Sequence, residues 1–175
     1  MKTKKTQNVL ASLNVLAWIA FIGLAIEAGS WLTAYGVSIF KPEASKNLYE
    51  GLDLSHLRAY SFVHYSILVL LKIAFYSLEA YAAYLLIKVL SKIKLASPFT
   101  KEVAKSLVGL SNIITAAWIV AAVHNSHIRW MSYDVTGLET NAIPLEFIFV
   151  AGVVYVLAQI FKKGVELQTE NDLTV

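Results

Sequence analysis

The feature that most constrains this chain is a long apolar segment that begins near residue 60 and ends in a basic connector near residue 100. A helix needs about 20 consecutive apolar residues to cross the hydrocarbon core of a bilayer. Residues 62–90 exceed that length, and before Lys88 they contain only two charged side chains, Lys72 and Glu79. This segment therefore predicts a membrane-spanning helix, and it makes the chain an expected integral membrane protein.

The composition of the chain agrees with a membrane protein. Of its 175 residues, 57% are hydrophobic and 15% are charged, so the chain is more apolar and less charged than an ordinary soluble domain. The net charge of +3 comes from Lys and Arg residues at the ends of apolar runs, which favours a membrane surface over direct nucleic-acid binding. The absence of Cys excludes disulfides, thiol catalysis and thiolate metal sites.

Four apolar segments predict four spans within a single domain of residues 1–175. The first is expected to remain uncleaved, because its apolar run of about 18 residues is longer than the core of a signal peptide. Trp31 and Tyr35 then fit an aromatic belt at the far interface. The predicted fold is all-α, an antiparallel four-helix transmembrane bundle with a polar tail at residues 164–175. The predicted spans are residues 8–32, 62–90, 104–123 and 144–161.

The distribution of basic residues predicts the orientation. Cytoplasmic loops carry an excess of Lys and Arg. If the N-terminus is cytoplasmic, ten basic residues lie inside and four lie outside, with Lys72 in the membrane. We therefore expect both termini in the cytoplasm. The inner group is Lys2, Lys4, Lys5, Lys88, Lys92, Lys94, Lys101, Lys105, Lys162 and Lys163, and the outer group is Lys41, Lys46, Arg58 and Arg129.

The connectors carry weaker signals. Residues 41–58 are polar enough to predict an exposed loop, with Asp53 or Ser55 capping a short helix, and residues 124–141 predict a second polar loop. Pro98 is expected to stop the second helix, and Thr100 to act as the N-cap of the third.

Polar side chains at membrane depth are costly and need a partner or a purpose. Tyr65, Lys72, Tyr76 and Glu79 recur at helical spacing and are expected to point inward, with Lys72 extending towards Glu27. Two interpretations are open: an ion or proton pathway, or hydrogen bonds that fix the register of the helices, which we favour. By depth, the expected neighbours are Asn112 and Tyr155 for Lys72, and Asn14 and Gln159 for Glu79.

Few residues in the sequence indicate a metal site or an active site. His124 and His127 are three residues apart, and Asp134 or Glu139 offers a third metal ligand, but no other His or Cys lies nearby in sequence. We interpret both histidines as loop residues at the outer interface. The sequence contains no Gly-rich phosphate loop, no Gly-x-Ser-x-Gly and no His-Glu-x-x-His. No metal, cofactor or enzymatic activity is expected.

The C-terminal end of the fourth span offers a docking point. Residues 161–168 are predicted to continue the helix beyond the lipid, which exposes Val165 and Leu167 to a partner. The connector residues Pro98, Phe99 and Thr100 are expected on the same cytoplasmic surface.

These residues also carry a resemblance. Pro98-Phe99-Thr100, Ala151-Gly152 and the ending at residues 160–175 resemble the four-span bacterial membrane proteins grouped as domain of unknown function 2975 (DUF2975). The resemblance implies an integral membrane protein, often encoded beside a small helix-turn-helix regulator of the Cro/C1 type. It supplies no catalytic residues, and it implies the bacterial inner membrane as the location.

Together, these observations predict a non-enzymatic inner-membrane protein that binds a partner or has a regulatory role, with a small helix-turn-helix regulator tethered at its cytoplasmic surface. The alternative is a small transporter or an immunity-type membrane protein that uses the face of Lys72 and Glu79.

Overall fold

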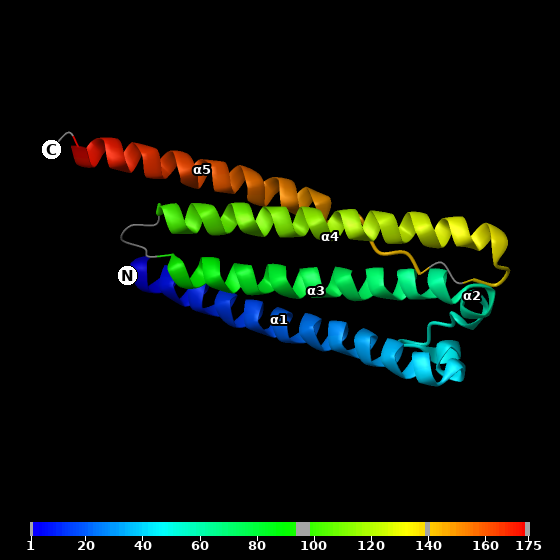
Figure 1. The fold of residues 1–175 in the computed structure, drawn as a ribbon. Helices are drawn as coiled ribbons and strands as arrows, with labels where there is room; N and C mark the ends of the chain where they lie inside the picture. The colour runs from blue at the N-terminus through cyan, green and yellow to red at the C-terminus, as the bar shows by residue number, and fades with distance from the viewer. Residues whose placement is uncertain (1, 94–98, 139–140, 174–175) are drawn as a thin grey trace. The chain divides into compact units, whose positions relative to one another are not determined.

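A computed structural model describes residues 2–93, 99–138 and 141–173 of the chain (Figure 1). Within these ranges the regular elements are helical, and no strand occurs. The predicted all-α fold class is therefore confirmed. In chain order the elements are α1 (Lys2–Phe40), the 3-10 helix η1 (Pro42–Asn47), α2 (Ser55–Tyr60), α3 (Phe62–Lys92), α4 (Lys101–Asp134) and α5 (Ile148–Leu173).

Four of these helices are long and apolar enough to cross a membrane, which confirms the prediction of four spans. The candidate spans contain 35, 31, 34 and 23 residues. At 1.5 Å per residue, each of these helices is longer than the thickness of a hydrocarbon core, which is roughly 30 Å. The chain is therefore a multi-pass membrane protein. The candidate spans are Thr6–Phe40, Phe62–Lys92, Lys101–Asp134 and Ile148–Glu170.

The exposed surfaces of the helices fit lipid better than water. Only 6% of the most apolar window of α1 is buried inside the protein, compared with 33% for α3. Large apolar side chains such as Ile19 and Ile26 are more than 60% exposed. Contiguous apolar surface of this kind is rare on soluble monomers, whereas a bilayer solvates it without cost.

The chain divides into two compact units. The terminal unit comprises Met1–Ile22, Glu79–Thr115 and Phe147–Val175, and it includes segments of all four long helices. The loop unit comprises Gly23–Leu78 and Ala116–Glu146, and it includes η1 and α2.

The core of the loop unit is built partly by the connector between α1 and α3. Leu48, Leu52, Leu54 and Leu57 are at most 6% exposed and belong to one cluster with the fully buried Trp31. The prediction that residues 41–58 form an exposed loop is therefore wrong for these leucines, although the charged side chains of Lys41, Glu43, Lys46 and Glu50 are exposed. The prediction rested on the charged residues of this segment and did not account for its four leucines. Burial of each leucine contributes roughly 1.5–3 kcal/mol to the stability of the fold.

The connector is fixed by local hydrogen bonds as well as by its leucines. The Leu54 amide donates to the Ser45 carbonyl at 2.9 Å. Asp53 Oδ1 accepts the Ser55 amide at 2.8 Å and the Ser55 hydroxyl at 2.6 Å, just before α2 begins. These bonds, led by that of the hydroxyl, hold the pKa of Asp53 below its ordinary value. The predicted short helix is present, but its N-cap is Leu54 and no side chain caps it, so the prediction that Asp53 or Ser55 is the cap is wrong. Asp53 instead bonds Ser55, the first residue of the helix.

The helix α4 is longer than the sequence predicted. Residues 124–134 were expected to be part of a polar loop, yet they continue α4 to Asp134. Ile128 and Met131, at most 3% exposed, place one face of this extension in the core of the loop unit. The prediction of a loop is wrong here because buried residues at helical spacing outweigh the polar composition.

In the terminal unit, α3, α4 and α5 share a small apolar core. Val89, Val103, Leu107 and Ala158 form a buried cluster. Ser111 Oγ donates to the Ala151 carbonyl at 3.0 Å, which ties α4 to α5. Short side chains at such a contact let the two helix backbones approach closely.

The predictions for the start of α4 and for the end of α5 are both confirmed. Thr100 Oγ1 accepts the Val103 amide at 3.2 Å, so Thr100 caps α4 as expected. Helix α5 continues beyond Lys163 to Leu173, and the predicted helical continuation of residues 161–168 is confirmed.

Candidate functional site

The residues that the sequence proposed for docking lie at the end of α5 and at the start of α4, within the terminal unit. Phe99 and Leu167 are exposed by 38% and 51%, and Val165 is half-buried. Thr100 is occupied as the cap of α4. Pro98 lies outside the described residues. Of the proposed docking residues, Phe99, Val165 and Leu167 therefore remain available to a partner.

The ring of Phe99 rests on a glycine of α5. A Cβ atom added at Gly164 would lie 2.5 Å from Cδ1 of Phe99, closer than any ordinary contact. The same ring packs against Phe161, with 5.2 Å between the ring centroids. Glycine is unfavourable inside a helix by about 1 kcal/mol relative to alanine. At this position it permits the ring of Phe99 to pack directly on the helix.

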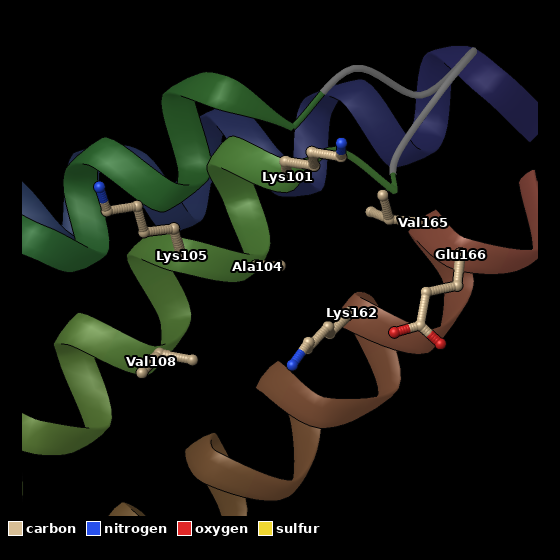
Figure 2. A pocket seen from close by; sticks show the side chains of 7 residues that line it. All are labelled: Lys101, Ala104, Lys105, Val108, Lys162, Val165 and Glu166. Carbon is tan, nitrogen blue, oxygen red and sulfur yellow. The ribbon is translucent and has the colours of Figure 1, made fainter. Parts of the chain in front are cut away.

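Two grooves border the end of α5. The apolar groove has a volume of about 630 Å³ and is lined by Phe99, Ile160, Lys163, Gly164, Leu167 and Gln168. The basic groove has a volume of about 430 Å³ and lies between α4 and α5 (Figure 2). It is lined by Lys101, Ala104, Lys105, Val108, Lys162, Val165 and Glu166.

The apolar groove carries little unbalanced charge. Its single cation, Lys163, forms an ion pair with Glu166 at 3.0 Å. Ile160 and Leu167, both more than half exposed, supply apolar surface beside the ring of Phe99. Such a groove suits the apolar face of a protein helix, because it offers oily surface without a strong requirement for a counter-ion.

A second candidate site surrounds Lys72 in the loop unit. This side chain is only 4% exposed, and its Nζ lies 4.3 Å from the ring centroid of Trp31. No ion pair to Lys72 occurs among the described residues. A cation over an aromatic face gains roughly 2 kcal/mol when it is desolvated. The indole of Trp31 is therefore the main partner of this buried charge.

Trp31 also connects Lys72 to a carboxylate. Its Nε1 donates to Glu27 Oε1 at 3.2 Å, and the Tyr49 hydroxyl donates to Glu27 Oε2 at 3.1 Å. Lys72 was predicted to extend towards Glu27, and in the structure the indole of Trp31 contacts both side chains. The expectation that Trp31 belongs to an aromatic belt is wrong, because its side chain is fully buried. The four-residue spacing from Glu27 to Trp31 was the available sequence signal.

Four other polar residues predicted at membrane depth lie in the terminal unit. Glu79 is half-buried, whereas Asn112, Tyr155 and Gln159 are exposed. No hydrogen bond or ion pair joins any two of these four side chains in the part of the chain that the structure describes. They therefore form no connected polar site with one another.

The histidines lie on helices and not in a loop, which corrects their predicted setting. His127 Nε2 lies 3.3 Å from Nδ1 of His64, a partner from α3 that the sequence did not indicate. His124 is buried, and its Nδ1 lies 3.3 Å from Oδ1 of Asn125. Glu139 is outside the described residues. Among those described, no three His, Cys, Asp or Glu side chains are placed to hold a metal.

The chain is similar to one known protein family. A family described as "Protein of unknown function (DUF2975)" matches residues 41–175. The chain belongs to this family. The predicted resemblance to DUF2975 is therefore confirmed, and the match includes α5, both grooves and Lys72. Trp31 and Glu27 precede the region of DUF2975 that is matched. No curated protein and no solved structure matches the chain.

Proposed function

We propose that this DUF2975 protein is a non-enzymatic regulatory protein of the bacterial inner membrane, and that it binds a cytoplasmic protein partner in its apolar groove. The observation that carries the proposal is the packing of Phe99 on Gly164, which leaves Leu167 half-exposed beside the ring. The excess of lysines near both termini supports a cytoplasmic position for the groove.

The level of the groove along α5 supports a protein partner in place of lipid. Lys162 and Lys163 mark where α5 leaves the hydrocarbon, because charged side chains avoid the bilayer core. Leu167 lies more than one helical turn further on and is 51% exposed. An apolar side chain at that distance beyond the hydrocarbon core faces water unless a protein covers it.

The proposed partner is a small helix-turn-helix regulator. The resemblance to DUF2975 implies such a neighbour, and a regulator of this kind presents amphipathic helices. One apolar helix face can fill the groove through contacts with Phe99, Ile160 and Leu167. Binding there would hold the regulator at the membrane and away from DNA, while this chain itself contacts no nucleic acid.

The proposal is tested by co-purifying the regulator encoded beside this protein with the full chain in detergent. Leu167→Glu places a charge in the groove and is expected to reduce recovery of the regulator at least tenfold, which corresponds to about 1.4 kcal/mol. The matched control is Thr169→Glu, which adds the same charge at an exposed position outside both grooves. Equal recovery with both variants, or undiminished recovery after truncation at Lys163, would refute the docking surface.

The alternative function, a small transporter or immunity-type protein, receives less support. The cavity beside Lys72 has a volume of only about 10 Å³. A single water molecule needs roughly that much room, so the space does not resemble an open pathway. Flux of a solute into liposomes that is lost on Glu79→Gln would favour the transporter over the regulatory protein.

A further inference from the structure

The basic groove combines two kinds of lining that a single ligand can satisfy. Figure 2 shows the groove between α4, which contributes Lys101, Lys105 and Val108, and α5, which contributes Lys162 and Val165. Three of the seven lining residues are lysines, and the groove contains one carboxylate, that of Glu166. The groove therefore has a net positive charge beside an apolar wall.

The lysines of the basic groove are not neutralised by ion pairs. Among the described residues, the ion pairs in this unit join Lys92 to Glu102 at 3.9 Å and Lys163 to Glu166 at 3.0 Å. The single carboxylate in the groove is thus already engaged by a lysine outside it. Lys101, Lys105 and Lys162 form no ion pair in this part of the structure, and their charges are available to an anion.

The apolar wall argues for a ligand with a hydrocarbon chain. Ala104 is buried, and Val108 and Val165 are half-buried, so the floor of the groove is apolar where the lysines form its rim. A small inorganic anion would gain nothing from that floor. The lysines also lie where α4 begins and where the apolar run of α5 ends, which is the level of lipid headgroups.

We infer that the basic groove binds an anionic phospholipid. The positive charges of Lys101, Lys105 and Lys162 attract its phosphate, and one acyl chain lies along Ala104 and Val108. Basic pockets between transmembrane helices on the cytoplasmic side are suited to anionic headgroups. The site is separate from the apolar groove, because Phe99 and Leu167 line only the latter.

The test measures lipid binding by the full chain in neutral detergent, with native mass spectrometry as the readout. Phosphatidylglycerol is compared with phosphatidylcholine that has the same acyl chains. Lys105→Gln with Lys162→Gln is expected to weaken phosphatidylglycerol binding about 30-fold, from the typical contribution of a lysine near an anionic surface. The matched control, Lys41→Gln with Lys46→Gln, removes the same charge from the loop unit and is expected to leave binding unchanged.

A charge-preserving variant separates loss of binding from loss of folding. Lys105→Arg with Lys162→Arg keeps both positive charges and is expected to bind phosphatidylglycerol within about threefold of the original chain. Equal binding of the two lipids, or equal losses with the test and control pairs, would overturn the inference. Competition by glycerol phosphate at the concentration of the lipid would assign the groove to a soluble anion.

Discussion

The packing of Lys72 on Trp31 leads to a quantitative prediction about how the loop unit is stabilised. Nζ of Lys72 lies 4.3 Å from the ring centroid, and the two side chains are 4% and 0% exposed. A cation–π contact contributes about 2 kcal/mol when it is desolvated. Lys72→Met keeps most of the length of the side chain and removes the charge, so it is expected to remove this contribution.

A double-mutant cycle isolates this contact from other effects of the substitutions. Trp31→Leu removes the ring and also the hydrogen bond to Glu27, which adds roughly 1.5–3 kcal/mol because the acceptor is charged. In the Lys72→Met background, Trp31→Leu is expected to cost about 2 kcal/mol less than in the original chain, since no cation remains to lose its partner.

The assay is unfolding by sodium dodecyl sulfate in mixed micelles, with helical circular dichroism as the readout for all four proteins. A coupling free energy near 2 kcal/mol supports the contact. A coupling below about 0.3 kcal/mol would refute it, because independent sites show values of that size. If Lys72→Met abolished regulator binding while stability was retained, a purely structural role for this charge would be wrong.

Three further predictions concern other parts of the fold. Gly164→Ala places a methyl group against the ring of Phe99 and is expected to lower unfolding free energy by about 1–3 kcal/mol in the same assay. The pKa of Asp53 is lowered in the folded protein, so its ionised carboxylate stabilises the start of α2 at pH values above the ordinary pKa. This stabilisation is lost as the pH falls through the folded pKa. Nuclear magnetic resonance of residues 55–60 checks this, and Asp53→Asn is expected to remove the pH dependence. Asn125→Ala removes both bonds to the Ile143 backbone, at 2.7 and 2.8 Å, and is expected to speed hydrogen exchange in residues 141–146.

Features that depend on a short stretch of chain were predictable from the sequence. The four spans follow from the hydropathy and the length of each segment. These two properties do not depend on which other segments pack beside it. Thr100 was identified as a cap because its hydroxyl bonds an amide three residues away. The family was likewise indicated by a contiguous ending at residues 160–175.

The candidate sites were only partly predictable, because they depend on which helix faces meet. Phe99 and Leu167 were identified singly, but the sequence did not show that Phe99 packs on Gly164 and leaves a groove beside it. Lys72 was recognised as a buried charge, whereas its partner, the ring of Trp31, lies on a different helix.

The sequence alone determined that the chain crosses a membrane in four apolar helices, because the transfer of each segment from water to lipid depends on that segment's own residues. Tertiary structure decided the rest. It buried Leu52 and Leu57 of a polar connector, extended α4 to Asp134, and placed the two grooves beside α5. These features arise from packing between segments far apart in the chain, and no local pattern encodes which partner each surface will meet.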